Sequence, residues 1–338
     1  MKAAVIFGGS GFIGCHYATA LLAAGAVDRV YLCDLVAPDF ARFGRDCEQA
    51  YANGAITYSS CDVRQPIDLD LAGDVTLIAN FAAIHREPGH DAFEYFQTNI
   101  LGAENVCYWA DTVNCQQLIF TSSIAPYGPA DKEKTEASIP TPVTPYGSSK
   151  LVAEKIHQAW QAQNSAERKL VIVRPGVVFG PGEGGNVTRL IKSVLGRYFF
   201  YMGNKKTHKA GTYVKELCRA MSWVLGRMDQ GGISLFNMSL NPAPDIQEYV
   251  ETICTTAGVK RRVPNVPFTL MYLASLIIDP IAKLFNINQP ISPVRIKKLV
   301  RSNNISPRFL EDQSYDYRFS FGQAMADWHS DQPADWGG

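Results

Sequence analysis

The sequence predicts an α/β fold with a doubly wound parallel sheet, followed by a smaller C-terminal α/β domain. Up to about residue 175, short apolar runs typical of buried parallel strands alternate with longer helical stretches. The first run, residues 3–7, leads directly into a glycine-rich turn that opens a helix. We therefore expect residues 1–175 to form the sheet domain. Residues 176–338 are expected to form mainly the second domain, with a segment near residues 210–240 returning to the first.

The bulk composition is that of an ordinary globular protein. Of the 338 residues, 46% are hydrophobic and 19% are charged. Lys and Arg together number 32, as do Asp and Glu, so a general nucleic-acid binder is not expected. The eight cysteines include no Cys-x-x-Cys pair, and the six histidines show no metal-ligand spacing. Without a signal peptide, disulfides or a metal site, a cytoplasmic protein is predicted.

The first turn has the character of a dinucleotide-binding loop. Glycines at positions 8, 11 and 14 make a G-x-x-G-x-x-G pattern between the first strand and a helix that runs to about residue 24. Without Cβ atoms, Gly8, Gly11 and Gly14 allow the backbone to approach a pyrophosphate closely. The first turn of the helix, with Phe12 and Ile13, would direct its free N–H groups and its positive dipole end at the phosphates.

The second strand, residues 29–33, ends at Asp34, which lies 20 residues past Gly14. An acidic side chain at this point is suited to hydrogen-bond the adenosine ribose hydroxyls, and it would repel a 2′-phosphate. The pattern favours NAD over NADP, although Arg29 and Arg42 leave some room for NADP. The structural alternative is that Asp34 simply begins a loop.

Further strands are expected at residues 55–58, 75–79, 117–120 and 170–173. A helix carrying Asn99 is expected at residues 91–112. Small residues after a parallel strand let a flat cofactor lie against the carboxyl edge of the sheet. The residues that follow these strands include Asp62, Val63, Phe81, Ala82, Ala83, His85, Ser122, Ser123 and Pro175.

A proline-rich loop, residues 140–145, precedes a helical stretch that runs to about residue 163. Tyr146 and Lys150 are spaced i,i+4, so this helix would place both on one face with Cβ atoms about 5–6 Å apart. An ammonium beside a phenol favours the phenolate and lowers its pKa from about 10. The pair is therefore a candidate general acid/base for carbonyl–alcohol chemistry. Alternatively, Tyr-x-x-x-Lys is a spacing found on many surface helices.

After residue 176 the pattern is looser. A glycine-rich loop at residues 180–185 is followed by expected helices at 187–196, 214–226 and 245–257 and a strand at 233–238. Residues 266–286 are strongly apolar, but Asp279-Pro280 leaves the unbroken part too short to span a bilayer. This stretch is interpreted as a core or lid helix, with a membrane-surface contact as the alternative.

Together these motifs resemble the extended short-chain dehydrogenase/reductase family, which contains nucleotide-sugar epimerases, dehydratases and reductases. The resemblance covers nearly the whole chain and implies a Rossmann domain with a smaller C-terminal substrate domain. It is carried by Gly8, Gly11, Gly14, Asp34, Asp62, Val63, Ala82, Ala83, Asn99, Ser122, Ser123, Tyr146, Lys150, Arg174, Pro175, Gly180 and Pro181.

The resemblance also implies roles for single residues. Tyr146 would be the acid/base, Lys150 would lower its pKa and hold the nicotinamide ribose, and Ser123 would polarise the reacting carbonyl. The implied adenine contacts are Asp62 and Val63. The implied nicotinamide pocket is formed by Ala82, Pro175 and Val178, and Phe81 and Ala83 are further implied cofactor contacts. The implied substrate contacts are His85, Asn99, Ser122 and Ser123.

Departures from the family patterns narrow the chemistry. The Thr-Asp-Glu of 4,6-dehydratases is replaced by Ser123-Ile124-Ala125, which lacks the carboxylate pair needed to move water. Ile124 also stands where GDP-fucose synthases have a cysteine. The segment after Arg174 is closer to the 3β-hydroxysteroid dehydrogenase-like branch. Lys209, in a basic cluster, matches the place of a diphosphate-binding Arg in sugar-nucleotide enzymes, or belongs to a solvated charged surface.

The predicted function is NAD(P)-dependent hydride transfer at a hydroxyl or keto carbon, foremost C4 of a nucleoside-diphosphate sugar used in polysaccharide biosynthesis. Epimerase and reductase outcomes stay open. The alternatives are a 3β-hydroxysteroid-dehydrogenase-like oxidoreductase of an apolar alcohol and a non-catalytic NAD-sensing protein. The resemblance further suggests a homodimer that forms through the helices at residues 91–112 and 146–163.

Overall fold

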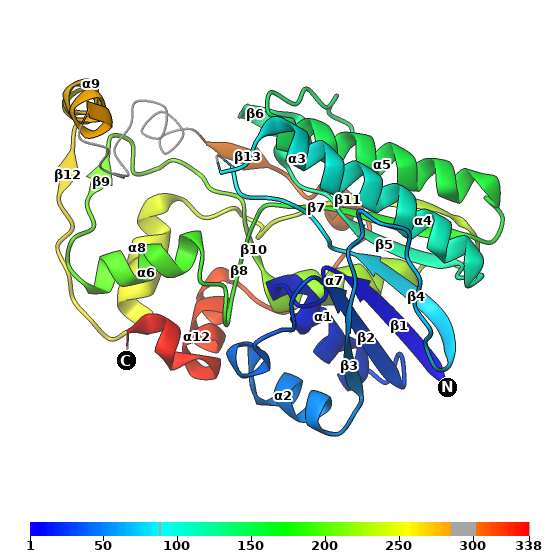
Figure 1. The fold of residues 1–338 in the computed structure, drawn as a ribbon. Helices are drawn as coiled ribbons and strands as arrows, with labels where there is room; N and C mark the ends of the chain where they lie inside the picture. The colour runs from blue at the N-terminus through cyan, green and yellow to red at the C-terminus, as the bar shows by residue number, and fades with distance from the viewer. Residues whose placement is uncertain (88, 285–301, 338) are drawn as a thin grey trace.

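The computed structural model describes residues 1–87, 89–284 and 302–337. A seven-stranded sheet in the order β11-β7-β5-β4-β1-β2-β3 runs through the larger part of the molecule (Figure 1). All neighbouring strands in it are parallel. Its strands are β1 (Lys2–Phe7), β2 (Arg29–Asp34), β3 (Ile56–Ser60), β4 (Asp74–Asn80), β5 (Gln117–Thr121), β7 (Lys169–Pro175) and β11 (Gly232–Met238). The predicted doubly wound sheet is confirmed, and its order reverses between β1 and β4.

Helices make up much of the remaining described chain. They are α1 (Phe12–Ala23), α2 (Arg45–Ala52), α3 (Ala92–Phe96), α4 (Gly102–Thr112), α5 (Pro145–Gln163), α6 (Asn186–Leu195), α7 (Val214–Gly226), α8 (Ile246–Thr256), α9 (Phe268–Leu284), α11 (Arg308–Asp312) and α12 (Phe321–Asp331). Short helical turns are η1 (Phe40–Phe43), η2 (Gln97–Leu101), η3 (Ala125–Tyr127) and η4 (Pro333–Trp336).

Three further strand pairs lie outside the central sheet: β8–β10, β9–β12 and β6–β13. Their bounds are β6 (Ala130–Lys134), β8 (Val177–Phe179), β9 (Tyr201–Met202), β10 (Gly211–Tyr213), β12 (Asn265–Val266) and β13 (Asn303–Ile305). Two of these pairs, β8–β10 and β9–β12, join segments that both lie after residue 176, whereas β6–β13 brings residues 303–305 back to residues 130–134.

Helices cover both faces of the sheet, as alternating strands and helices require. On one face, β-strand side chains pack with α1 and α7 in a core that includes Tyr17, Leu217 and Met221. On the other face, α4 and α5 supply Trp109 and Trp160 to a second core. The runs of consecutive apolar residues in the strands are explained by this burial on both sides.

A third core lies beyond the end of β7, among α6, α8 and α12 (Figure 1). Phe179, Tyr213, Tyr249 and Trp328 meet there, with Phe179 in ring contact with each of the other three. The 176–338 domain assignment stays a prediction. Two observations bear on it: this separate core, and β11, which joins the central sheet beside β7.

The structure differs from the sequence expectations in several helical segments. The expected single helix at residues 91–112 is interrupted by η2, a five-residue π-helix that contains Asn99. The helix α2, the pair β6–β13 and the C-terminal helices α11 and α12 were not anticipated. Their sequences are short or polar, so tertiary packing rather than local propensity decides their structure, and α12 packs in the third core.

The apolar stretch at residues 266–286 forms β12 and α9, and its last two residues lie outside the described part of the chain. The helix continues past Asp279-Pro280 rather than ending there. Among the residues that the structure describes, no helix is long and apolar enough to cross a membrane.

Candidate active site

The glycine turn brings the end of β1 against the end of β4. Gly8 has a φ of +73°, and a Cβ atom there would lie 2.5 Å from the backbone nitrogen of Ala82. A Cβ atom at Gly14 would lie 2.5 Å from the carbonyl oxygen of Gly9. Both positions therefore require glycine, and the turn leaves the carboxyl ends of the strands open to a flat ligand.

The N-terminus of α1 opens at this turn. Its N-cap is Gly11, which has no side chain to satisfy the first N–H groups, those of Phe12 and Ile13. The hydroxyl of Ser10 is buried without a hydrogen-bond partner among the described residues. A buried orphan hydroxyl beside free helix N–H groups fits the phosphates of a dinucleotide, which would supply acceptors to both.

Asp34 closes the other side of the turn. Its carboxylate accepts hydrogen bonds from the backbone nitrogens of Ser10 at 3.1 Å and Leu35 at 2.8 Å. Arg42, which left room for NADP, donates instead to the carbonyl oxygens of Gly182 at 2.7 Å and Glu183 at 3.1 Å. With Asp34 at the turn and Arg42 engaged elsewhere, the site suits ribose hydroxyls better than a 2′-phosphate.

The two expected adenine contacts lie next to each other after β3. Asp62 is held by Arg64 in a two-pronged ion pair, with Nη2–Oδ2 at 2.7 Å, which lowers the pKa of Asp62. Val63 is buried, and it lies so close to Gly102 that a Cβ atom on that glycine would meet its Cγ2 at 2.9 Å. Val63 is therefore fixed against α4, and the carboxylate of Asp62 is already occupied by a cation.

The expected catalytic residues come together at the start of α5. Thr144 caps this helix by accepting a hydrogen bond from the nitrogen of Gly147 at 3.1 Å, and Pro145 occupies the first turn. The cap positions Tyr146 so that its phenol lies near the hydroxyl of Ser123, which follows β5 and lowers the pKa of the phenol. Lys150, one turn later, is buried with its Nζ 4.4 Å from the centre of the Phe120 ring.

The electrostatics of this cluster correct one expectation. Lys150 was expected to lower the pKa of Tyr146, but burial raises the pKa of Tyr146 to about 12, and Ser123 is the group that lowers it. The ammonium of Lys150 lies over Phe120, and burial lowers its own pKa to about 7, opposed by the charge of Glu154. A neutral phenol is therefore the resting form, and additional positive charge is needed to favour the phenolate.

His85 and Asn99, the expected substrate contacts, have different surroundings. His85 reaches solvent, and its pKa is lowered by partial desolvation and by the charges of Arg86 and Lys150. Asn99 is buried; its Oδ1 accepts from the nitrogen of Ile84 at 3.0 Å and its Nδ2 donates to Ser149 Oγ at 2.8 Å. His85 is therefore near the catalytic cluster, whereas Asn99 braces the loop after β4 against α5.

Ser122 belongs to a buried network that the sequence did not reveal. Its hydroxyl donates to Glu154 at 2.5 Å, and Glu154 forms an ion pair with Arg174 at 2.6 Å. The guanidinium of Arg174 lies 4.7 Å from the centre of the Tyr127 ring. The sequence signal for this network was the position of Glu154, four residues after Lys150 on the same helix. The network fixes α5, β5 and β7 beneath the candidate catalytic residues.

The remaining expected residues line the same region. Phe12, Ile13, Phe81 and Val178 pack against the core on the α1 side of the sheet, whereas Ala82 packs against the α4 side. Of the other residues predicted for the site, Ala83 is half-buried. Pro175 is buried, and its carbonyl oxygen accepts a hydrogen bond from the nitrogen of Ile124 at 3.2 Å.

The backbone of Lys209 pairs with two other segments of the chain. Its nitrogen donates to the oxygen of Pro244 at 3.0 Å, and it bridges to Asn303. Burial lowers the pKa of the Lys209 side chain to about 8. Lys206, in the same basic cluster, is paired with Asp245 at 3.0 Å. Lys209 is therefore more enclosed than a solvated charged surface would require.

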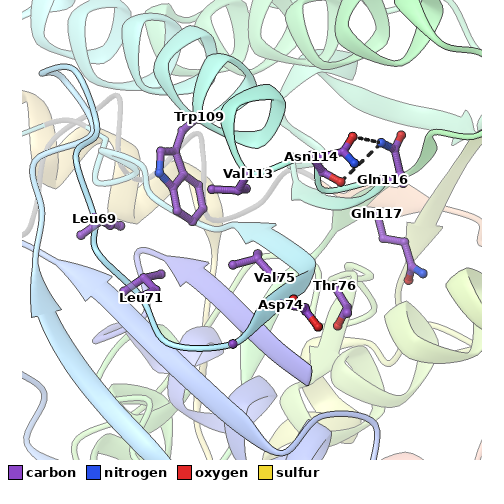
Figure 2. A pocket seen from close by; sticks show the side chains of 11 residues that line it. Leu69, Leu71, Asp74, Val75, Thr76, Trp109, Val113, Asn114, Gln116 and Gln117 are labelled. Atoms are coloured by element: carbon purple, nitrogen blue, oxygen red, sulfur yellow. Dashed lines mark hydrogen bonds between the residues drawn. The ribbon is translucent and has the colours of Figure 1, made fainter. Parts of the chain in front are cut away.

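A cavity of about 490 Å³ elsewhere on the sheet does not belong to this site. Figure 2 shows Asp74, Val75 and Gln117 on its wall, at the amino ends of β4 and β5. The glycine turn and Ser123 lie at the carboxyl ends of the strands. Ligands of open parallel sheets bind at the carboxyl edge, so this cavity is not the candidate active site.

Curated relatives carry related activities. A protein of Escherichia coli O157:H7 named N-acetyl-α-D-glucosaminyl-diphospho-ditrans,octacis-undecaprenol 4-epimerase is 26% identical over 323 residues, which is 95% of this chain and 92% of that protein. The similarity extends through the whole chain, including the region after residue 176.

Solved structures share the fold. The UDP-glucuronic acid 4-epimerase of Bacillus cereus, in complex with NAD, covers 99% of this chain and all of its own, with a TM-score of 0.75 and 18% identity. The UDP-glucose 4-epimerase of Thermus thermophilus, also with NAD, covers 98% of each chain, with a TM-score of 0.69 and 19% identity.

The family comparison agrees with the geometry. Residues 4–238, which contain the glycine turn, Asp34, Ser123, Tyr146 and Lys150, match a family described as the NAD dependent epimerase/dehydratase family. This match confirms the predicted NAD-dependent class and the predicted enzyme group. The chain therefore belongs to the NAD dependent epimerase/dehydratase family.

Proposed function

We propose that this protein is an NAD-dependent epimerase that oxidises and re-reduces C4 of a sugar carried on a diphosphate. The observation that carries the proposal is that Tyr146 and Ser123 come together at the start of α5, with Lys150 buried one helical turn away. The cluster lies at the carboxyl edge of the sheet, where the glycine turn and Asp34 fit a dinucleotide.

In the proposed reaction, Tyr146 takes the proton of the C4 hydroxyl while the hydride leaves the same carbon. NAD, when bound, supplies the hydride acceptor for this step and the donor for its reversal. Ser123 hydrogen-bonds the oxygen as it becomes a carbonyl and then an alcohol again. Lys150 is proposed to hold the nicotinamide ribose, as the family resemblance implies. The 4-keto sugar turns within the site, and Tyr146 returns the proton after reduction on the other face.

The carrier of the sugar is proposed to be a nucleoside diphosphate, with Lys209 close to the diphosphate. A polyprenyl diphosphate is a second candidate, because the E. coli relative that covers 95% of this chain is named for a sugar on diphospho-undecaprenol. A turnover assay with UDP-, dTDP-, GDP- and CDP-sugars beside polyprenyl-diphosphate N-acetylglucosamine separates the two candidates. Turnover of a sterol alcohol alone would contradict both.

The nucleotide cofactor that the purified protein retains tests the cofactor proposal. Because Asp34 faces the turn and Arg42 is engaged by Gly182 and Glu183, we expect NAD to bind at least about tenfold more tightly than NADP. Mass spectrometry of the ligand released on denaturation, followed by calorimetric titration, measures this preference. Retained NADP, or equal affinity for both cofactors, would contradict the role of Asp34.

The mechanism is tested by the substitution Tyr146→Phe, which removes only the phenolic oxygen. We expect kcat to fall by about 10²–10⁴-fold while NAD affinity is kept, because proton transfer is lost and the cofactor contacts remain. Tyr51→Phe, which removes an exposed phenol on α2, is the control and should keep wild-type turnover. Undiminished turnover of Tyr146→Phe would exclude the mechanism.

We also propose that the protein forms a homodimer in the cytoplasm. A dimer is supported by apolar side chains that are exposed along α3, η2, α4 and α5, namely Phe93, Phe96, Leu101, Tyr108 and Val152. A reducing compartment is supported by the eight cysteines, which are all free thiols. The diphosphate sugar is proposed to bind between the sheet edge and the residues after 176.

A further inference from the structure

The outer face of α9 is apolar and open to solvent. Leu270 is 60% exposed and Leu273 is 59% exposed, and Leu276 and Ile278 are also exposed. Helices of such uniform apolar composition are normally buried in a core or in lipid. An isolated exposed leucine needs no explanation, but successive exposed leucines on consecutive turns of one helix indicate a contact surface.

The inner face of α9 is already used by the protein itself. Phe268 and Tyr272 stack at 5.8 Å between ring centres, and the hydroxyl of buried Ser275 donates to the oxygen of Tyr272 at 2.6 Å. A Cβ atom on Gly203 would lie 3.1 Å from the Cβ of Phe268, so the start of α9 is seated beside the β9–β12 pair. The exposed leucines therefore lie on a helix that is anchored at its base.

Figure 1 shows α9 at the outer edge of the molecule, next to β9 and β12 and far from the central sheet. The candidate catalytic residues Ser123, which follows β5, and Tyr146, in α5, belong to the part of the molecule on the other side of β13 in this view. The exposed face of α9 is thus a surface separate from the candidate active site and from the proposed dimer helices.

The two chain segments that meet at the base of α9 contain basic residues but no acidic ones. Residues 186–209 and 257–278 contain no Asp or Glu, although the whole chain has as many acidic as basic residues. Their basic residues are Arg189, Lys192, Arg197, Lys205, Lys206, Lys209, Lys260, Arg261 and Arg262. The two segments meet through the β9–β12 pair, where Gly203 N donates to Val266 O at 3.0 Å. Exposed cations, including Lys205 and Arg262, therefore flank the root of the apolar helix.

We propose that α9 and the cations at its base form a docking surface for an anionic lipid bilayer. The leucines of α9 enter the headgroup–acyl boundary, while Lys205, Lys260 and Arg262 contact lipid phosphates. Apolar side chains beside exposed basic residues are the combination that interfacial helices use. The helix lies on the bilayer, consistent with the finding that no helix among the described residues can cross one.

The basic residues around α9 favour an anionic lipid bilayer over a second copy of the chain as the partner of this surface. Two copies placed face to face through α9 would bring two sets of exposed basic residues together, which disfavours that contact. An anionic bilayer complements both the leucines and the cations. Docking does not depend on the reaction, because Lys205, Lys260, Arg262 and the leucines of α9 belong neither to the candidate catalytic cluster nor to the proposed substrate contacts.

The test is sedimentation of the full chain with vesicles of phosphatidylcholine alone or mixed with phosphatidylglycerol. We expect the wild type to sediment with the anionic vesicles at least about tenfold more strongly, and to be released by salt. Leu270→Glu/Leu273→Glu should abolish sedimentation, and Lys260→Gln/Arg262→Gln should remove most of the preference for anionic lipid. Ile139→Glu/Ile233→Glu, which places the same charges at exposed apolar positions elsewhere, should sediment like the wild type.

Thermal unfolding and gel filtration of each variant accompany the sedimentation. Because the substituted side chains are exposed, the variants should unfold at the wild-type temperature. The proposal is overturned if the wild type stays in the supernatant with anionic vesicles, or if Leu270→Glu/Leu273→Glu sediments as well as the wild type. It is also overturned if that variant instead lowers the oligomeric mass, since α9 would then be an interface between copies.

Discussion

Two adjacent serines at the end of β5 have opposite surroundings, although the sequence cannot distinguish them. Ser123 lies near the phenol of Tyr146 and lowers its pKa, while Ser122 donates to buried Glu154 at 2.5 Å. We expect Ser123→Ala to lower kcat by at least about tenfold with unchanged stability, because the carbonyl loses a hydrogen-bond donor. Ser122→Ala should instead lower the free energy of unfolding by about 1–3 kcal/mol and keep kcat within about threefold.

Steady-state kinetics and urea unfolding of both serine variants check this division of roles. Each variant is the control for the other, because both lose one hydroxyl at the same strand end. Equal losses of turnover would show that Ser122 also contacts the substrate, as its place in the sequence motif first suggested.

His157 makes stability depend on pH. Its Nδ1–H donates to the oxygen of Ala153 at 2.7 Å and its Nε2 accepts from Asn80 at 3.2 Å, so the ring is neutral. Burial lowers the pKa of His157 to about 4 in the folded protein from 6.5, the ordinary value it regains on unfolding. Between these values the unfolded chain binds more protons, so stability falls as the pH is lowered through this window.

The measurement is the free energy of unfolding in urea at a series of pH values for the wild type and His157→Gln. We expect the wild type to lose more stability on acidification than the variant, whose amide does not titrate. Burial lowers the pKa of His16 to about 4 as well, so the variant should keep part of the pH dependence. Parallel curves for the two proteins would contradict the buried neutral imidazole.

The helices and strands were predictable to the extent that their own sequences carry a strong pattern. The strands of the sheet and α5 are marked by apolar runs and by the Thr144-Pro145 start, so their place could be read from the chain. The π-helix at Asn99 could not, because it depends on hydrogen bonds from Asn99 to Ile84 and to Ser149, on distant segments. Such contacts have no periodic signature along one stretch of sequence.

The ion pair between Glu154 and Arg174 ties α5 to β7, with both side chains almost fully buried. Removing one charge leaves the other buried and unpaired, so we expect Glu154→Leu to lower the free energy of unfolding by about 3–5 kcal/mol. Replacing both charges, in Glu154→Leu/Arg174→Met, should recover most of that loss. Chemical denaturation measures both variants, and a double variant no more stable than the single one would contradict the explanation.

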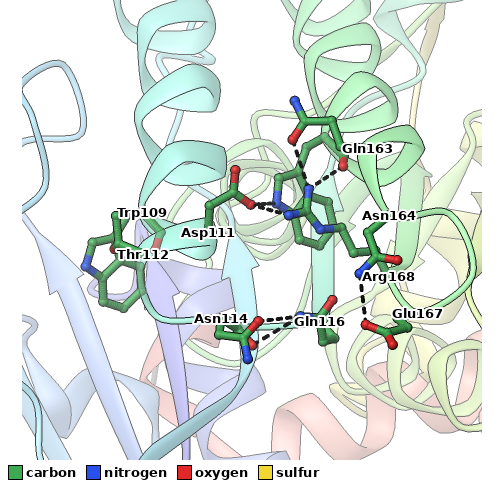
Figure 3. A network of polar contacts seen from close by, with 10 residues as sticks. Trp109, Asp111, Thr112, Asn114, Gln116, Gln163, Asn164, Glu167 and Arg168 are labelled. Carbon is green, nitrogen blue, oxygen red and sulfur yellow. Dashed lines mark hydrogen bonds and ion pairs between the residues drawn. The ribbon is translucent and has the colours of Figure 1, made fainter.

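The whole molecule is expected to pair through α4 and α5. Figure 3 shows the brace that fixes these helices to each other, in which Arg168 donates to Asp111 at 2.6 Å and to Gln163 at 3.1 Å. Tyr108, on the same helix as Asp111, is 72% exposed. A rigid pair of helices with an exposed apolar face is suited to a symmetric interface.

Light scattering after gel filtration tests the dimer with Phe93→Glu/Tyr108→Glu, which places charges on the exposed apolar face. We expect a dimer for the wild type and a monomer for the variant, with an unchanged unfolding temperature per chain. The control Ile139→Glu/Ile233→Glu should remain dimeric. A monomeric wild type, or a variant that stays dimeric, would exclude this interface.

Within the whole molecule, the candidate catalytic cluster was easier to predict from the sequence than the candidate substrate site. Ser123, Tyr146 and Lys150 follow motifs whose spacing along the chain reports their position at one sheet edge. Lys209 and the network around Glu154 depend on segments that meet only after folding, such as the approach of Lys209 to Pro244. The identity of the sugar carrier therefore could not be derived from residue spacing alone.

The central claim is that hydride leaves and returns to C4 of the same sugar. The most direct measurement uses the diphosphate sugar that the protein turns over, carrying deuterium on C4, in ordinary water. The account predicts that the epimerised product keeps its deuterium on C4, because the hydride is held on NAD between the two half-reactions. Loss of the deuterium to solvent, or epimerisation that proceeds unchanged in Tyr146→Phe, would contradict it.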